Sequence, residues 1–189
     1  MSESEYLEFE KHSEVKHEYY QGEIFALTGA TRNYNVIAGN VFGSLRGALP
    51  EECLLFMNDM RVKVEATGLY TYPDVVVVCG EEEYQDDAQT TLLNPVLVVE
   101  VLSDSTEAYD RGKKFEMYRT IPSLQEIVYV AQERQSIDLF RRGEERWALY
   151  DPVDGQITLA SVGATLSMND VYARVEWNQD APSDANASS

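Results

Sequence analysis

The segment NPVLVVEVLSDSTEAYDRGKKFEMY, residues 94–118, decides the fold of this chain. Every residue from Val96 to Leu102 is valine or leucine except Glu100. An uninterrupted apolar run predicts a strand covered on both faces, because a strand with one solvent-exposed face alternates apolar and polar residues. A carboxylate in such a strand is costly unless it is paired, protonated or bound to a metal ion. Glu100 is therefore the first candidate for a functional residue.

The segments around this strand predict an α/β fold. A helix is expected from about Thr106 to Arg119, and the segment LQEIVYVA, residues 124–131, predicts the next strand. The strand–helix–strand order indicates a sheet with at least one crossover connection. Residues 75–79 predict a further buried strand, and the alternating segments between 136 and 162 predict an antiparallel extension.

The N-terminal part of the chain predicts two helices on either side of a hairpin. Residues 2–13 read as a short helix with a serine cap. Gln21-Gly22 is a turn signal between two short strands, so Glu23 opens the second strand. Thr31 is a suitable cap for the next helix, and Pro50 ends it.

The length and composition predict one globular domain, residues 1–177, followed by a flexible acidic tail, residues 178–189. Hydrophobic residues make up 44% of the chain, which is enough for a substantial core. No apolar run approaches the roughly 20 residues that span a bilayer, and the acidic first residues do not resemble a secretory signal. We therefore expect a cytoplasmic protein without membrane contact, with Cys53 and Cys79 as buried, reduced thiols.

The net charge limits how this protein can bind a polyanion. Acidic residues outnumber basic ones by 33 to 15, which gives a formal net charge of −18 and argues against tight, metal-independent DNA binding. The total does not describe every face, because residues 81–87 and the tail carry many of the acids. The predicted helix, in contrast, carries a group of basic residues, Arg111, Lys113, Lys114 and Arg119. A polyanionic partner would have to meet this local patch or a bound cation.

Two carboxylates and one helix face are the candidates for chemistry. Asp74 and Glu100 each lie in or next to an apolar strand. If the two strands are neighbours, these hard oxygen ligands suit Mg²⁺, and the alternative is that each carboxylate pairs with a nearby Arg or Lys. Asp110, Lys114 and Tyr118 are spaced four residues apart and share one helix face. This face holds either a surface ion pair or a lysine that orients or deprotonates an attacking water.

Several segments in the same order resemble the Uma2 family of the PD-(D/E)XK nuclease superfamily. They are Tyr72-Pro73-Asp74, Glu100-Val101-Leu102-Ser103, and Asp110-Arg111-Gly112-Lys113-Lys114-Phe115 with Tyr118. The resemblance extends over residues 5–175 and implies a restriction-endonuclease-like fold. This is a mixed β-sheet core flanked by helices, with an antiparallel β extension.

The resemblance also implies roles for individual residues. Asp74 corresponds to the Asp of the PD motif and Glu100 to the acid of the (D/E)XK motif. The motif lysine would stand at position 102, which is leucine here, and Lys114 on the following helix is its match. The implied catalytic residues are Asp74, Glu100, Lys114 and Glu23. The implied ligands of Mg²⁺ or Mn²⁺ are Asp74, Glu100, the backbone carbonyl of Val101, and Glu23.

The first functional hypothesis is a Mg²⁺-dependent endonuclease that hydrolyses phosphodiester bonds in DNA, with Arg111, Lys113 and Arg119 touching the nucleic-acid backbone. The second is a catalytically silent member of the same fold that acts as a dimeric DNA- or protein-binding module. The net charge favours the second hypothesis, as does Tyr34, which stands where many members of the family carry a histidine. An RNA-directed nuclease is a third alternative. In each case the expected form is a homodimer.

Overall fold

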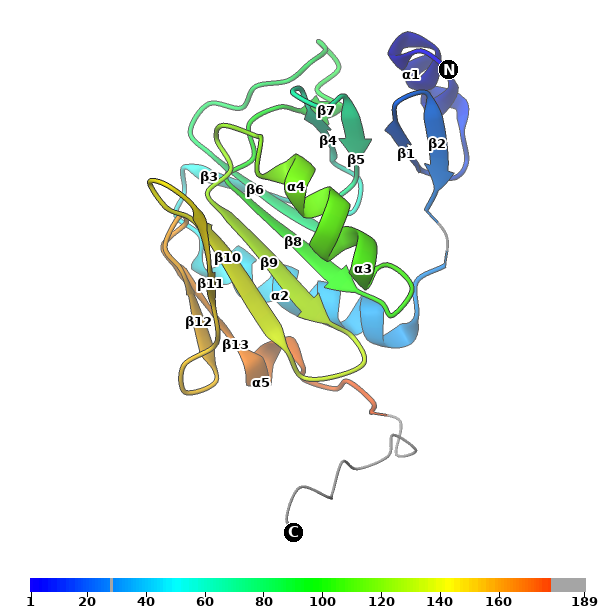
Figure 1. Ribbon diagram of the computed structural model, residues 1–189. Coiled ribbons are helices and arrows are strands. Elements are labelled where there is room, and N and C mark those ends of the chain that lie inside the picture. The colour runs from blue at the N-terminus through cyan, green and yellow to red at the C-terminus, as the bar shows by residue number, and fades with distance from the viewer. Residues whose placement is uncertain (28, 178–189) are drawn as a thin grey trace.

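A six-stranded sheet forms the centre of the computed structural model, which describes residues 1–27 and 29–177. The predicted acidic tail, residues 178–189, lies outside the described residues. The strand order is β11-β10-β9-β8-β6-β3. In chain order these strands are β3 Cys53–Met57, β6 Val75–Cys79, β8 Leu97–Leu102, β9 Glu126–Ala131, β10 Ile137–Arg142 and β11 Trp147–Tyr150. Figure 1 shows helix α2, Arg32–Ala48, on one face of the sheet and the α3–α4 segment on the other.

The predicted crossover is confirmed between β8 and β9, which are the parallel pair of this sheet, whereas its other strand pairs are antiparallel. The crossover is predicted as one helix but consists of three short segments. These are α3 Glu107–Tyr109, the π-helical segment η1 Asp110–Lys114 and α4 Phe115–Tyr118. In η1 the amide of Phe115 donates to the carbonyl of Asp110, five residues earlier. Gly112 lies inside η1, and glycine weakens a regular α-helix at such a position.

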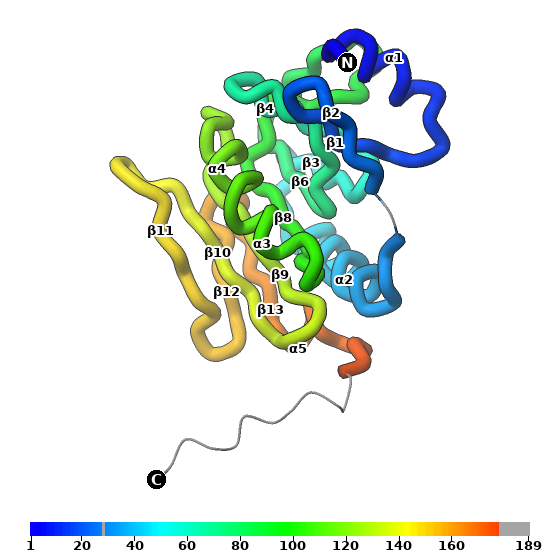
Figure 2. The backbone as a smooth tube through the Cα atoms, turned by 45° about the vertical axis from the view of Figure 1, so that its right-hand side comes forward, coloured from blue at the N-terminus to red at the C-terminus, as the bar shows by residue number. Residues whose placement is uncertain are grey.

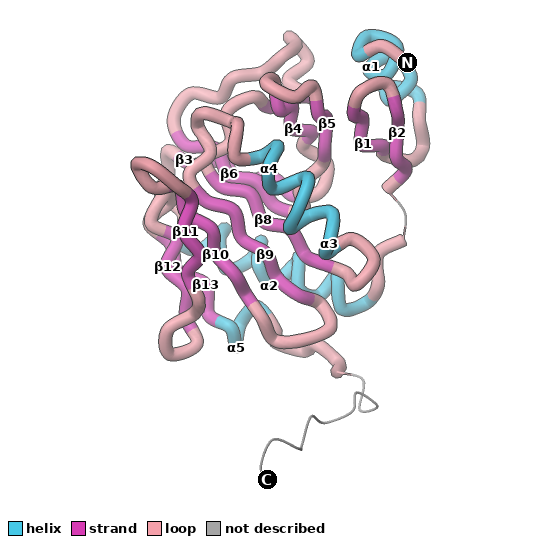
Figure 3. Tube along the Cα trace, viewed as in Figure 1, coloured by secondary structure: helices cyan, strands magenta, loops and turns pink. Residues whose placement is uncertain are grey.

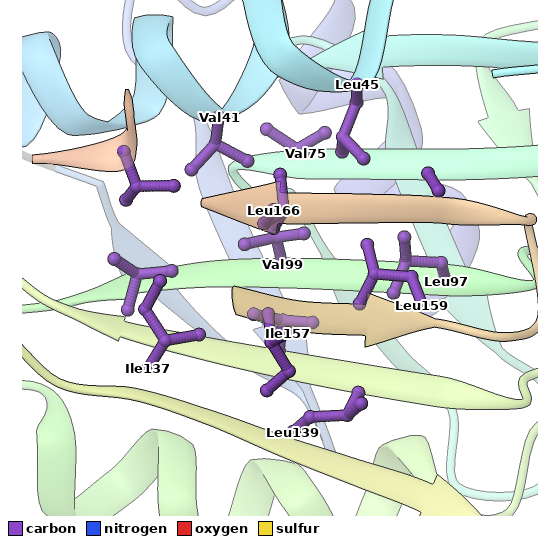
Figure 4. Close-up of a cluster of buried hydrophobic side chains, with 14 of the residues drawn as sticks. Val41, Leu45, Val75, Leu97, Val99, Ile137, Leu139, Ile157, Leu159 and Leu166 are labelled. Carbon is purple, nitrogen blue, oxygen red and sulfur yellow. The ribbon is translucent and has the colours of Figure 1, made fainter. Parts of the chain in front are cut away.

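Both faces of β8 are buried, as its apolar sequence predicts. Val99 faces α2 and belongs to the same core as Val41 of that helix, and Figure 4 shows both side chains in this core. Val98 faces the other way, into the core that contains Tyr118 of α4. Because side chains alternate along a strand, Glu100 points toward the α4 side, within a layer of apolar residues.

A second, five-stranded sheet carries the N-terminal hairpin, in the order β2-β1-β5-β4-β7. Its strands are β1 His17–Tyr20, β2 Glu23–Ala26, β4 Arg61–Val64, β5 Leu69–Thr71 and β7 Thr91–Leu92, and the first helix is α1 Glu3–His12. The turn predicted at Gln21-Gly22 is confirmed, since both residues have positive φ angles, 49° and 90°. Figure 2 shows β1 and β2 beside α1, at the end of the molecule opposite β12 and β13.

The predicted antiparallel extension is divided between two sheets. Strands β10 and β11 complete the six-stranded sheet, whereas β12 Gln156–Leu159 and β13 Ala164–Ser167 form a separate hairpin, followed by α5 Met168–Val171 (Figure 3). Ile157 and Leu166 of this hairpin pack into the same core as α2. None of the helices within the described ranges combines the length and the apolar character that a membrane span requires.

Cys53 and Cys79 form a disulfide bond, so the prediction of reduced thiols is wrong. The two residues are direct partners in the antiparallel β3–β6 pair, with their Cα atoms 4.0 Å apart. Directly opposed residues point their side chains to the same face, where the two sulfur atoms can bond. The separation of 26 residues in sequence hides this contact, because strand register decides which residues face each other.

Loss of this disulfide should lower the free energy of unfolding. A crosslink that spans 26 residues removes chain entropy worth about 3–4 kcal/mol from the unfolded state. In urea denaturation, the double variant Cys53→Ser, Cys79→Ser should therefore be less stable than the oxidised protein. Dithiothreitol should lower the stability of the wild type and leave that of the double variant unchanged. Equal denaturation midpoints with and without dithiothreitol would contradict this prediction.

Candidate active site

Asp74 joins helix α2 to strand β8. It immediately precedes β6, which runs antiparallel to β8, so it lies beside the C-terminal half of β8. One of its carboxylate oxygens accepts a hydrogen bond from the backbone N–H of Val101 at 2.6 Å. The other accepts a hydrogen bond from the hydroxyl of Tyr34 on α2, which also lies 3.2 Å from Oδ1 of Asn58. Asp74 thus contacts β8 just before the start of β6.

A single ammonium group connects three more carboxylates. Lys114 is only 4% exposed, and its Nζ lies 2.9 Å from Oε1 of Glu100 and 3.0 Å from Oε1 of Glu18. Oδ1 of Asp110 is 3.5 Å away. The hydroxyl of Tyr118 donates a further hydrogen bond of 2.5 Å to Glu100. We call Glu18, Asp74, Glu100 and Asp110, together with Lys114, the carboxylate cluster.

The predicted helix face is confirmed, because Asp110, Lys114 and Tyr118 all reach this cluster. Asp110 and Lys114 belong to η1, and Tyr118 is the last residue of α4. The ion pair between Asp110 and Lys114 is nevertheless buried rather than exposed, so the alternative of a simple surface pair is wrong.

Burial raises the pKa of both Asp74 and Glu100, because the charged forms lose their hydration. Hydrogen bonds from Tyr34 and Val101 oppose this rise at Asp74. At Glu100 the Lys114 ammonium opposes it, whereas the negative charge of Asp74 adds to it. Burial alone would lower the pKa of Lys114, but the carboxylates around it, Glu100 first among them, raise the pKa above its usual value. The ammonium is therefore held in its charged form.

Residues 3–169 match the model of a protein family, Uma2, which is described as "Putative restriction endonuclease". The chain belongs to the Uma2 family. It is 34% identical over 175 residues to "Uncharacterized protein slr1290" of Synechocystis sp., with 91% of each chain covered. It is also 35% identical over 148 residues to "Uncharacterized protein sll1609" of the same organism, with 77% of this chain and 84% of that protein covered.

A solved structure shares the fold of this Uma2 protein. It is the crystal structure of "a putative nuclease belonging to DUF820" from Anabaena variabilis. The TM-score is 0.73, and the match covers 91% of this chain and 97% of that one at 16% sequence identity. A likeness at this identity establishes the fold, and the site has to be argued from its own residues.

In this Uma2 protein the β1–β2 hairpin contributes Glu18 to the cluster. The family resemblance in the sequence implied Glu23 instead. Glu18 is buried and contacts Lys114. Glu23 is exposed, and its side chain makes no hydrogen bond or ion pair among the described residues. The reason is the position of the turn, because Glu23 lies opposite Tyr20 at the end of the hairpin. The signal for Glu18 was available in HEYY, where, like Glu100, it is the one acid in a short strand.

The basic residues predicted to touch nucleic acid do not form one basic surface. Arg111 forms ion pairs with Glu107 at 2.7 Å and Asp138 at 2.5 Å. These partners neutralise its positive charge within the protein. Arg119 forms an exposed pair with Glu116. Of the three predicted residues only Lys113 is exposed without an ion pair among the described residues, and its Nζ lies 4.3 Å from the ring centre of Tyr20.

The donor set of this Uma2 site fits a divalent cation with few protein ligands. Within residues 1–27 and 29–177, no three His, Cys, Asp or Glu side chains are arranged as a ready metal site. Mg²⁺ does not need three, because it is commonly held by one or two carboxylates and keeps several waters. The cluster also has a shortage of positive charge, since Lys114 pairs with three carboxylates and Asp74 adds a fourth, which is held by hydrogen bonds from Tyr34 and Val101. Asp74, Glu100 and the carbonyl of Val101 are the residues that would hold such an ion.

Replacement of Lys114 by methionine should destabilise the protein strongly. The variant keeps an unbranched apolar stem but leaves Glu18, Glu100 and Asp110 buried without their common counter-charge, which costs about 3–5 kcal/mol. Lys113→Met is the matched control and should change stability by less than about 0.5 kcal/mol, because Lys113 is exposed. Chemical denaturation of both variants measures the difference. Equal effects of the two substitutions would show that the ion pairs of Lys114 contribute little.

Proposed function

We propose that this Uma2 protein is a Mg²⁺- or Mn²⁺-dependent endonuclease that hydrolyses phosphodiester bonds in DNA. The observation that carries the proposal is the excess of buried carboxylates over ammonium groups in the carboxylate cluster. Asp74 and Glu100, with the carbonyl of Val101, would hold the ion. When bound, a divalent cation stabilises the negative charge that develops on a phosphate under attack.

Lys114 has the position of a residue that orients the attacking water. Its Nζ is 2.9 Å from Glu100, so a water or phosphate oxygen next to Glu100 would be within its reach. Because the surrounding carboxylates keep the ammonium charged, Lys114 can donate hydrogen bonds but cannot accept a proton from the water. Glu18 and Asp110 hold the ammonium in place on either side. We therefore assign Lys114 an orienting role and not the role of a general base.

The choice of DNA rests on the family. The family description names a restriction endonuclease, and this type of enzyme cuts DNA. The related solved structure is named a putative nuclease, and its likeness to this chain supports a nuclease-like fold. We also propose that the protein works as a homodimer, and that it does so in the cytoplasm, as expected from a sequence whose first residues do not resemble a secretory signal. Analytical ultracentrifugation would measure its oligomeric state, and a monomer would contradict the first of these two points.

The second candidate function is a catalytically silent binding module. Two observations favour it. The Lys114 ammonium already lies among three carboxylates of the cluster, and Tyr34 donates its hydroxyl hydrogen to Asp74. The site can therefore be stable without a metal ion. Burial and the charge of Asp74 raise the pKa of Tyr34, so its hydroxyl stays protonated and remains a donor to this carboxylate.

Metal binding should distinguish the two functions before any substrate is tested. If Asp74 is a ligand, millimolar Mg²⁺ or Mn²⁺ should raise the melting temperature of the wild type by mass action. Asp74→Ala should remove this shift, whereas Asp87→Ala, which changes an exposed acid, should retain it. Differential scanning calorimetry measures all three proteins. A wild type that shows no metal-dependent shift would favour the silent module.

Cleavage assays complete the test. The wild type with Mg²⁺ or Mn²⁺ should cut plasmid DNA, and EDTA or Asp74→Ala should abolish the activity. Asp87→Ala should cut as the wild type does. A parallel assay with RNA addresses the alternative substrate. A protein that binds metal but cuts neither DNA nor RNA would refute the proposed endonuclease.

A further inference from the structure

An exposed aromatic ring lies directly beside the carboxylate cluster. In the β1–β2 hairpin, Phe25 is the register partner of Glu18. Directly opposed residues in an antiparallel pair point to the same face, with their Cβ atoms about 5 Å apart. Since Glu18 contacts Lys114 on this face, Phe25 must flank the cluster. Its side chain is nonetheless 50% exposed, although an aromatic ring is normally buried in a core.

A second aromatic group continues this face. Tyr20 is two residues after Glu18, so its side chain also points to the cluster side of the hairpin. The ammonium of Lys113 lies 4.3 Å from its ring centre. Lys113 is exposed and forms no ion pair among the described residues, so its charge remains available to a ligand. We call Tyr20, Phe25 and Lys113 the aromatic rim.

The charge of the protein decides what kind of ligand this rim suits. With a formal net charge of −18, the chain repels a polyanion over most of its surface. The other basic residues near the site, Arg111, Lys114 and Arg119, already have acidic partners. Contacts to phosphates therefore supply little binding energy. Nucleic-acid bases, in contrast, are uncharged and stack on exposed aromatic rings.

We propose that the aromatic rim binds unstacked bases, so that the preferred substrate is single-stranded nucleic acid or an unpaired segment of a duplex. Phe25 provides a stacking surface next to the carboxylate cluster. Tyr20, which is partly buried against the core, holds Lys113 beside the site, and Lys113 contacts the adjacent phosphate. Paired bases in a duplex stack on one another and hide their faces from such rings. The inference rests on the proposed function and narrows its substrate class.

The test uses fluorescence anisotropy with a labelled oligothymidylate of about 20 nucleotides, which is longer than the site size of typical single-strand-binding folds. A duplex of the same length is the comparison. Ca²⁺ is present throughout, because it takes the same oxygen ligands as Mg²⁺ but at longer distances. The wild type should bind the single strand at least about 10-fold more tightly than the duplex. Phe25→Ala should remove most of this difference, the loss expected for one stacked base.

Matched variants separate stacking from other effects. Phe25→Trp keeps an aromatic face and should bind as the wild type does. Phe25→Leu keeps an apolar side chain without that face and should behave like Phe25→Ala. Tyr150→Ala removes an exposed aromatic ring on β11, in the other sheet, and should have no effect. Since Phe25 is half exposed, each variant should keep the melting temperature of the wild type.

Four outcomes would overturn the inference. The first is equal binding of single strand and duplex, and the second is no binding of either. The third is a Phe25→Ala variant that binds the single strand normally but changes from dimer to monomer in size-exclusion chromatography. This last result would make the rim an interface between two copies of the chain. The fourth is metal-dependent cleavage of duplex plasmid that Phe25→Ala leaves unchanged, which would leave the proposed endonuclease intact.

Discussion

The contact of one ammonium group with three carboxylates holds this molecule together at its centre. Lys114 lies on η1, and its partners come from β1, β8 and η1 itself. Strand β1 belongs to the five-stranded sheet and β8 to the six-stranded sheet, so the ion pairs join two sheets that share no strand. Each of these carboxylates would be costly to bury alone. The crossover segment and the N-terminal hairpin are joined to each other through this side chain.

Asp74 plays a corresponding part on the side of α2. It accepts hydrogen bonds from the helix, through Tyr34, and from β8, through Val101. The same side chain is the first candidate for a metal ligand. The fold and the proposed chemistry therefore use the same two oxygen atoms. A carboxylate that accepts one hydrogen bond on each oxygen still has a lone pair on each to offer to a cation. This arrangement lets a site with an excess of negative charge remain folded.

The parts of the fold that rest on apolar patterning could be predicted from the sequence. The uninterrupted run around Glu100 indicates a strand covered on both faces, and the structure buries both. Contacts that depend on strand register were not accessible in the same way. The bond between Cys53 and Cys79 and the choice of Glu18 over Glu23 both follow from which residues face each other across a pair. Sequence spacing does not contain this information.

Charge was the other feature that the sequence could not resolve. Several basic residues on one segment suggest a basic surface. A basic side chain adds positive potential to the surface, however, only if no acidic residue of the protein already pairs with it. Arg111 is held by Glu107 and Asp138, and the latter lies on β10. This pairing depends on a strand that follows the helix in the chain. The number of basic residues on one segment therefore overestimates the positive charge that is available to bind a ligand.

Glu18 and Lys114 of the cluster lie far apart in the sequence, so they leave the ribosome at different times during synthesis. The N-terminal hairpin leaves the ribosome first, with Glu18 already in place on β1. Its partners on β8 and η1 are made much later. A nascent chain that ends before Lys114 has a carboxylate-bearing hairpin but no counter-charge against which to dock it. The ion pairs between the two sheets can thus form only after the crossover segment has emerged, which delays assembly of the site until most of the domain has been translated.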